Sequence, residues 1–288
     1  MQEEMLKPNQ LCDASINGGV TKSKLTLVQL IVLGLFAGAF IAFGAVVGAV
    51  ASHSITNVGV AKLVNGSVFP IGLILVVICG AELFTGNVLM VVPAADKKIK
   101  VSSILRNWVI VFLANLAGAI IIAFLVYSAG TLGLNDGKVG GSVIKVAATK
   151  AGLPFFNAFC SGILCNMLVC LAVWGAAAAK DVFGKALIIW FPIMTFVTCG
   201  FEHSVANMYY LFVGIFAKGN ASYVQASGLA QKKLDLVSLS GAIHNLIPVT
   251  LGNIVGGALF IGLAYYLVYK HVPNKMANIS PKSSDIKI

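Results

Sequence analysis

The chain has 288 residues, of which 58% are hydrophobic and only 10% are charged, and its mean hydropathy is +0.93. This composition excludes a soluble domain, because the apolar residues form runs long enough to cross a bilayer. The formal net charge of +10 does not indicate a nucleic-acid partner, because the lysines lie in short stretches between the apolar runs, where they set membrane topology. We therefore expect an all-α membrane protein.

The first 24 residues are polar and lack the apolar core and cleavage site of a secretory signal peptide. They predict an arm, for which a soluble segment and an interfacial helix fit equally well. The first span is expected from Leu25 to about Val50, because roughly 20 apolar residues cross the hydrocarbon layer. Residues 51–66 carry several polar side chains and are predicted as a loop.

The second apolar segment, residues 68–92, contains features that a continuous helix accommodates poorly. These are Pro70, Glu82 and a Thr-Gly-Asn triplet. We expect a half-helix, a non-helical loop around residues 83–87, and a second half-helix. Such backbone survives at membrane depth only where protein or a water-filled cavity satisfies it.

Four more apolar runs complete the membrane region. The spans are expected at residues 101–129, 153–179, 186–215 and 240–269, the fifth span is interrupted at 198–203, and 130–152 and 218–239 are expected as loops. With the amino terminus inside, cytoplasmic segments hold 13 of the 20 lysines and arginines. We therefore predict that both termini are cytoplasmic.

Two stretches 120 positions apart share one pattern. GAELFTGN at residues 80–87 and GFEHSVAN at 200–207 place Gly, Glu and Asn at the same internal spacing. Of the ten acidic residues, only Glu82 and Glu202 lie within hydrophobic segments. Charge in such a segment is costly and usually faces a bundle interior or a conduit. The repeat predicts two matched helix breaks with a pathway between them.

The repeat extends to the neighbouring spans. A Gly-xxx-Ala motif at Gly38 corresponds to Gly-xxx-Asn at Gly162, and Asn115 in the third span corresponds to Asn253 in the sixth. Because each half has three spans, the halves have opposite orientations. We expect a 3+3 inverted repeat with broken second and fifth helices, which places discontinuous helices and a substrate site near the membrane midplane.

The breaks suit anion chemistry. Half-helices ending at mid-membrane present free N–H groups and the positive end of a dipole at their N-termini. His203 would lie between them, where an imidazole is suited to donate a hydrogen bond or transfer a proton. Glu82 and Glu202 are expected to accept hydrogen bonds from loop N–H groups and so hold each break in shape.

Other polar side chains leave two interpretations open. Thr85 is expected either to contact the substrate or to bond its local backbone. Asn166 and Asn253 either line the pore or tie helices together. The six cysteines lack metal-type spacing and mostly fall within predicted spans, so neither a disulfide nor a metal is assigned, and no cofactor is expected.

Four segments closely resemble the formate/nitrite transporter family. They are GAELFTGN at residues 80–87, GILCNMLVCLAVW at 162–174, FPIMTFVTCGFEHSVANM at 191–208 and NLIPVTLGNIVGG at 245–257. The resemblance implies an aquaporin-like protomer with its own pore, assembled as a homopentamer in the plasma membrane. It also implies passage of small monovalent anions (hydrosulfide, formate, nitrite) between two hydrophobic constrictions. Within the family, the chain looks most like the clostridial hydrosulfide channel, which favours hydrosulfide as the substrate. The loop reads Phe-Thr-Gly-Asn where some formate channels have Phe-Thr-Ser-Thr.

The resemblance also implies individual roles. His203 would be the central histidine, Thr85 the loop threonine, Asn166 and Asn253 the pore asparagines, and Lys150 the vestibule lysine that draws anions in. The constrictions would be lined by Phe69, Leu73, Leu83, Val169 and Phe196. The chain then divides into an arm at 1–24, a channel domain at 25–270 and a cytoplasmic tail at 271–288.

Two other functions compete with an anion channel. One is a conduit for neutral solutes such as water or ammonia. The other is an intramembrane hydrolase using Glu202, His203 and Ser204. Adjacent residues on a helix point in different directions, and the chain has no HExxH motif, so an enzyme is not expected.

Overall fold

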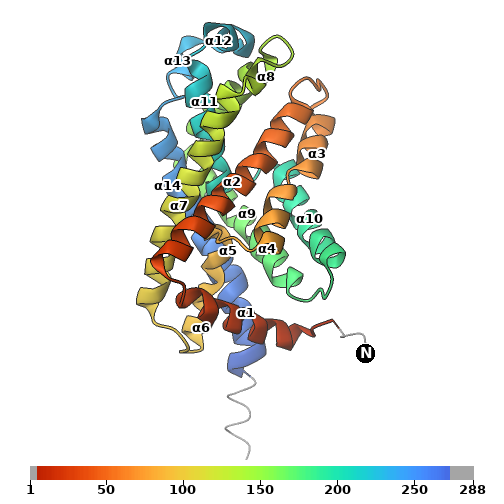
Figure 1. Ribbon diagram of the computed structural model, residues 1–288, viewed down its shortest axis with the longest axis vertical. Helices are drawn as coiled ribbons and strands as arrows, with labels where there is room; N and C mark the ends of the chain where they lie inside the picture. Colours follow the sequence, from red (N-terminus) through yellow and green to blue (C-terminus); the bar gives the residue numbers. More distant parts are fainter. Residues whose placement is uncertain (1–4, 273–288) are drawn as a thin grey trace, which may run out of the picture.

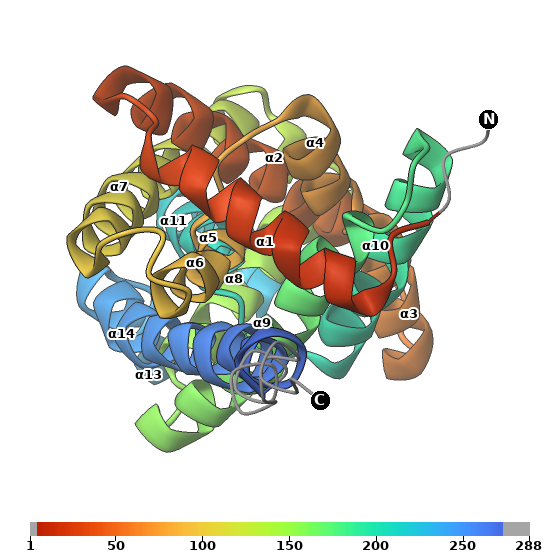
Figure 2. The same ribbon diagram turned by 90° about the horizontal axis from the view of Figure 1, so that it is seen from below.

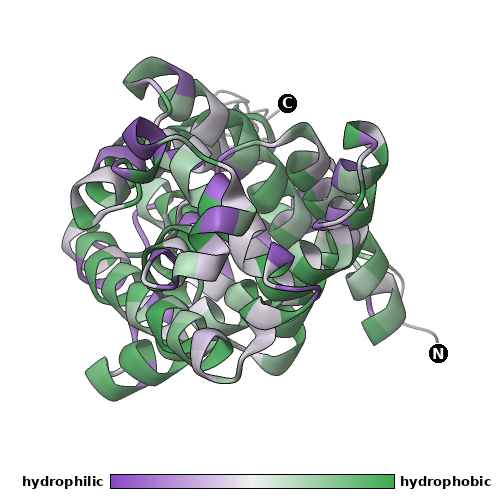
Figure 3. Cartoon of the chain, turned by 90° about the horizontal axis from the view of Figure 1, so that it is seen from above, coloured by the Kyte–Doolittle hydropathy of each residue, from purple (hydrophilic) through white to green (hydrophobic). Residues whose placement is uncertain are grey.

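The computed structural model describes residues 5–272, and this part of the chain is built from helices without a strand. Six of its helices are long and apolar enough to cross a membrane, and their outward faces are predominantly hydrophobic (Figure 3). The all-helical, six-span prediction is confirmed.

The first half of the chain contains α1 to α7 (Figure 1). Its helices are α1 (Pro8–Ser23), α2 (Leu27–Ser52), α3 (Val58–Val68), α4 (Ile71–Cys79), α5 (Phe84–Asn87), α6 (Val91–Ala95) and α7 (Val101–Ser128). The second half contains α8 (Lys138–Ala151), α9 (Phe155–Ala176), α10 (Val182–Cys199), α11 (Ser204–Lys218), α12 (Ala221–Ser227), α13 (Gln231–Leu234) and α14 (Leu239–Val255). The last helix continues to His271 through a π-helical stretch (Gly256–Leu263), α15 (Ala264–Tyr266) and a second π-helical stretch (Leu267–His271).

The two halves pack in the same way, as an inverted repeat requires. Helix α2 packs on α7 and α9 packs on α14. A Cβ atom on Gly118 of α7 would overlap the carbonyl oxygen of Leu35, and a Cβ atom on Gly256 would overlap that of Ile163. Each pair of helices therefore crosses at a glycine that permits backbone contact.

The register expected between the first and fourth spans is wrong by one turn. The amide of Asn115 donates to the carbonyl of Gly34, and the amide of Asn253 donates to that of Gly162. Gly34, not Gly38, is thus the counterpart of Gly162. The two glycines of the first span are four residues apart, so both fit a small-residue motif, and only the contact with the asparagine distinguishes them.

The repeat begins earlier than the first span. Helix α1 runs across the face of the bundle seen in Figure 2 and packs on α6, so most of the arm is a helix packed against the bundle. Lys22 of α1 and Lys150 of α8 each pair with the glutamate of their own half, which makes α1 and α8 counterparts. The loop expected at 130–152 is wrong, because α8 buries one face against α11 despite its glycines.

Two other expected loops contain helices. Helix α3 begins at Val58, where Asn57 caps it by accepting from the backbone of Val60, and runs into α4 as one bent span over 58–79. The polar residues that suggested a loop, including Lys62 and Asn65, line a cavity instead. Residues 218–239 contain α12 and α13. The cytoplasmic tail expected at 271–288 lies almost entirely outside the described residues.

Candidate functional site

Both predicted breaks are present. Helix α4 ends at Gly80 and α10 ends at Gly200, two glycines in the left-handed conformation with φ of +80° and +75°. Glycine adopts such angles without steric cost. The non-helical residues of the first break are 80–83, not 83–87, since Thr85 already belongs to α5.

A buried asparagine ties each break to the bundle. Asn253 donates through Nδ2 to the carbonyl of Glu202 at 3.0 Å, and its Oδ1 accepts from the N–H of Ser204 at 2.9 Å. Asn115 repeats both contacts with the carbonyl of Glu82 and the N–H of Phe84, each at 2.9 Å. One carbonyl and one N–H group at each break are therefore satisfied inside the protein, as membrane depth demands.

The two glutamates hold their breaks differently from expectation. Oε1 of Glu202 accepts from Lys150 Nζ at 2.8 Å, and its Oε2 accepts from Asn207 Nδ2 at 2.6 Å. Glu82 accepts from Lys22 at 2.5 Å and from Asn87 at 2.7 Å. Within residues 5–272, neither glutamate accepts from an N–H group of its loop, and the asparagine of each half takes the N–H two residues after the glutamate.

Three cavities lie in series along the pathway: one vestibule beside each break and a chamber between the two vestibules. The α8-side vestibule has a volume of about 360 Å3 and reaches from Ser52 and Lys150 to His203. The α1-side vestibule has about 300 Å3 and includes Lys22 and Glu82. Between them lies a central chamber with only about 10 Å3 for the centres of water molecules, which is room for roughly one water.

The central chamber is apolar except for one imidazole. Its lining consists of Ile41, Phe69, Leu73, Leu83, Val169, Ile193, Phe196 and His203. All five residues that the resemblance assigns to constrictions are among these. Phe69, Phe196 and His203 also line the α8-side vestibule, and Leu73 and Leu83 also line the α1-side vestibule. These two groups therefore separate the chamber from its vestibules.

Ile41 and Ile193 were not predicted as lining residues, although the repeat contains the signal for both. Ile193 lies 120 positions after Leu73, and Ile41 lies 128 positions before Val169, the same offset that relates Lys22 to Lys150. By the same rule, the counterpart of His203 is Leu83. An imidazole therefore stands where the pseudo-symmetry of the chamber would place a second leucine.

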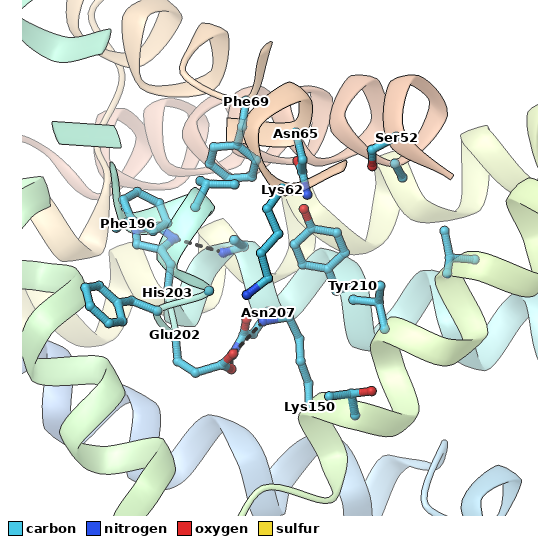
Figure 4. Close-up of a pocket in the computed structure, with 18 of the residues that line it drawn as sticks. Ser52, Lys62, Asn65, Phe69, Lys150, Phe196, Glu202, His203, Asn207 and Tyr210 are labelled. Atoms are coloured by element: carbon cyan, nitrogen blue, oxygen red, sulfur yellow. Dashed lines mark hydrogen bonds and ion pairs between the residues drawn. The ribbon is translucent and has the colours of Figure 1, made fainter. Parts of the chain in front are cut away.

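The ring of His203, which lies beside Phe196 in Figure 4, has both of its nitrogens engaged. Nδ1 accepts from the backbone N–H of Ala206 at 3.0 Å and so caps α11. A neutral ring then carries its proton on Nε2, which lies 2.9 Å from Thr85 Oγ1 and donates to it. The ring also stacks on Phe196, with centroids 5.7 Å apart. The imidazole is thus fixed in orientation and in tautomer.

The remaining polar candidates lie behind the cavity walls. Thr85 is fully buried and bonds His203, but it does not line any of the three cavities. Asn166 donates to the carbonyls of Thr85 and Asn253 at 3.2 and 2.7 Å. Neither Asn166 nor Asn253 is a lining residue of these cavities, so the geometry places both where they tie helices together.

Lys150 lies in the α8-side vestibule, as the resemblance implies. Its ammonium group pairs with Glu202 and lies 5.3 Å from the ring centroid of Tyr210, and only 14% of its side chain is exposed. Among residues 5–272, no group of three His, Cys, Asp or Glu side chains could hold a metal ion.

The fold and the site together define a class: a helical membrane channel or transporter with an inverted repeat, in which two polar vestibules meet at a narrow apolar chamber. The particular family follows from sequence. The formate/nitrite transporter family model matches residues 9–267, and the chain belongs to this family.

Several known proteins are similar to the chain over most of their length. A probable formate transporter of Methanothermobacter thermautotrophicus is 41% identical, over 86% of this chain and 91% of that protein. The formate channel FocA of Escherichia coli K12 is 38% identical, over 92% and 95%.

Solved structures with a similar fold support this assignment. A pentameric formate channel with formate bound has a TM-score of 0.78 and 37% identity, over 84% of this chain and 97% of that one. A second FNT family ion channel has a TM-score of 0.77 and 30% identity, over 90% and 98%. An aquaglyceroporin from Plasmodium falciparum, 16% identical over 88% and 100%, has a TM-score of 0.50. The last likeness concerns the fold alone and confirms the aquaporin-like architecture.

Proposed function

We propose that this chain is a channel for small monovalent anions of weak acids, with formate as its principal substrate. The observation that carries the proposal is the central chamber: a buried, apolar space of roughly one water volume with a single imidazole, placed between two vestibules that contain lysines. Formate is favoured because the similar proteins include formate channels and a structure with formate bound.

The chamber determines the form in which the substrate crosses. A bare anion loses its hydration there and gains little in return, so its passage carries a large desolvation penalty. The neutral acid does not carry this penalty. In the proposed cycle, the anion takes a proton from water in one vestibule, crosses as the neutral acid, and returns the proton to water in the other vestibule. One proton therefore accompanies each anion.

His203 donates a hydrogen bond in this cycle, not a proton. Its Nδ1 accepts from Ala206, so loss of the Nε2 proton would leave an imidazolate in an apolar chamber. The neutral acid instead accepts the hydrogen bond of Nε2–H in place of Thr85, and Thr85 accepts it again when the acid leaves. Thr85 acts as a positioning residue that holds the ring until the substrate arrives.

Hydrosulfide is the second candidate substrate. Its protonated form has one heavy atom, which matches a chamber of about one water volume more closely than the three heavy atoms of formic acid. Formate requires the side chains that line the chamber to move during passage. Nitrite is a third candidate, because the description of the matching family names it beside formate.

We also propose a homopentamer in the plasma membrane with both termini cytoplasmic. The support for five copies is the similar pentameric formate channel. On the membrane face of this chain, an apolar groove of about 410 Å3 between α7 and α14 suits a packing surface. The proposed orientation rests on the basic residues, which gather on the side of α1 and in residues 97–106, at the start of α7.

Flux into proteoliposomes tests this function. With an outside excess of formate, hydrosulfide or nitrite, we expect uptake well above that of protein-free liposomes, and faster uptake at lower pH because more substrate is protonated. Osmotic water flux and ammonia flux are measured on the same vesicles. If only these two neutral solutes crossed faster than in protein-free liposomes, the chain would be a neutral-solute channel and the proposal would be wrong.

A further inference from the structure

Lys62 has a position in the α8-side vestibule that neither the sequence motifs nor the family resemblance indicates. It is carried by α3, in the stretch expected to be a loop, and its side chain reaches into the vestibule towards Glu202 (Figure 4). A Cβ atom built on Gly200 would lie 3.7 Å from Lys62 Nζ. The ammonium group therefore lies beside the break that carries Glu202 and His203.

The charges around this vestibule do not cancel. Its charged lining residues are Lys62, Lys145, Lys150 and Glu202. Glu202 neutralises Lys150 at 2.8 Å, whereas Lys62 forms no ion pair or hydrogen bond with any residue in the described range 5–272. Lys150 thus contributes little net positive potential, and the uncompensated charges are those of Lys62 and Lys145.

The inverted repeat supplies a control within the molecule. In the α1-side vestibule, the charged lining residues are Lys22 and Glu82, which pair and sum to zero. Gly80, the counterpart of Gly200, has no atom within 4 Å of a Cβ built on it. Helix α4 therefore ends at its left-handed glycine without a lysine beside it. By analogy, the end of α10 does not need Lys62 for its structure. Capping of the α10 carbonyl groups therefore does not explain the position of Lys62.

We propose that Lys62 captures the substrate anion at the α8-side mouth of the pathway, while Lys150 serves as the structural partner of Glu202. The ligand is a small monovalent anion such as a carboxylate, bound by the ammonium group beside Gly200. This inference rests on the proposed anion-channel function and assigns the capturing charge to a residue outside the family motifs. It also makes the two mouths unequal, because among the described residues that line the two vestibules only those on the α8 side include an unpaired cation.

The test compares variants in intact cells, where the α8 side faces the medium in the proposed orientation. Initial formate uptake is measured against external formate at low and at physiological ionic strength. Lys62→Gln is expected to raise the half-saturating concentration about fivefold at low ionic strength, to leave the maximal rate unchanged, and to lose most of this effect at higher salt because screening weakens the attraction. Lys62→Arg keeps the charge and is expected to behave as wild type.

Two matched variants locate the effect. Lys232→Gln makes the same change in net charge on α13, which lies at the same end of the molecule but outside the vestibule (Figure 1), and is expected to leave uptake unchanged. Lys145→Gln alters the vestibule away from Gly200 and is expected to have a smaller effect than Lys62→Gln. Equal effects of these two vestibule variants would show a diffuse potential and overturn a defined site at Lys62.

A second readout does not depend on transport. Formate that binds the folded protein raises its melting temperature in detergent. At one subsaturating formate concentration and low ionic strength, we expect a clearly smaller shift in Lys62→Gln than in the wild type and Lys62→Arg, because its affinity for formate is about fivefold lower. If the wild type carried no formate, the proposed function would fail, whereas a Lys62→Gln protein with wild-type uptake and wild-type thermal shift would overturn only the assignment of Lys62.

Discussion

Asn253→Ala is expected to destabilise the folded protein by about 3 kcal/mol. The side chain makes three buried hydrogen bonds, to the carbonyls of Gly162 and Glu202 and from the N–H of Ser204. Removing it leaves three backbone groups unsatisfied, each at a cost of about 1 kcal/mol or more. The measurement is a reversible unfolding titration with a denaturing detergent in mixed micelles.

The control lies one turn away on the same helix. Thr250 has a buried hydroxyl group with no hydrogen-bond partner, so Thr250→Val is expected to be neutral or slightly stabilising. Asn115→Ala, the counterpart in the other half, is expected to match Asn253→Ala. Equal stability of Asn253→Ala and Thr250→Val would show that the asparagine does not hold the break together.

His203→Asn is expected to lower formate flux at least about tenfold. Asparagine is a strong N-cap residue, so it keeps an acceptor for the Ala206 N–H and preserves α11. It removes the Nε2–H donor of His203, the one polar residue among those that line the chamber. One hydrogen bond in an apolar site contributes about 1.4 kcal/mol to the barrier, which is tenfold in rate. Stopped-flow uptake into liposomes measures the loss.

His244→Asn is the matched control. This histidine is exposed, lies 3.1 Å from the carbonyl of Leu153 and lines none of the three cavities. Formate flux through His244→Asn should therefore equal that of the wild type. Wild-type flux through His203→Asn across the pH range would mean that the imidazole takes no part in passage.

The repeat in the sequence was sufficient to predict the architecture. Two acidic residues in otherwise apolar segments, each five positions before an asparagine, indicated two breaks and the opposite orientation of the halves. These residues are informative because a charge in the bilayer needs a specific partner. The lysine partners of the two glutamates could not be predicted in this way. Lys22 is 60 residues from Glu82, on a helix that the sequence presented only as a polar arm.

The helices that the sequence missed have a common physical origin. Helix α8 contains two adjacent glycines, and α3 carries Lys62 and Asn65, so local propensity predicts loops in both places. Tertiary packing overrides that propensity: Gly140 and Gly141 of α8 lie against Tyr223 and the backbone at Ala226. The side chains of the chamber also come together through long-range contacts. In the sequence, the only sign of these contacts is the constant offset between corresponding residues of the two halves.

The central claim is that the substrate crosses the chamber as a neutral acid. Formate uptake into liposomes clamped at 0 and at about −100 mV inside, with a pH indicator trapped within, tests it directly. We expect the same initial rate at both voltages and one proton delivered with each formate. A potential of about 100 mV acts on a crossing charge with about 2.3 kcal/mol, so an uptake rate that falls severalfold at the negative potential, with no acidification inside, would contradict it.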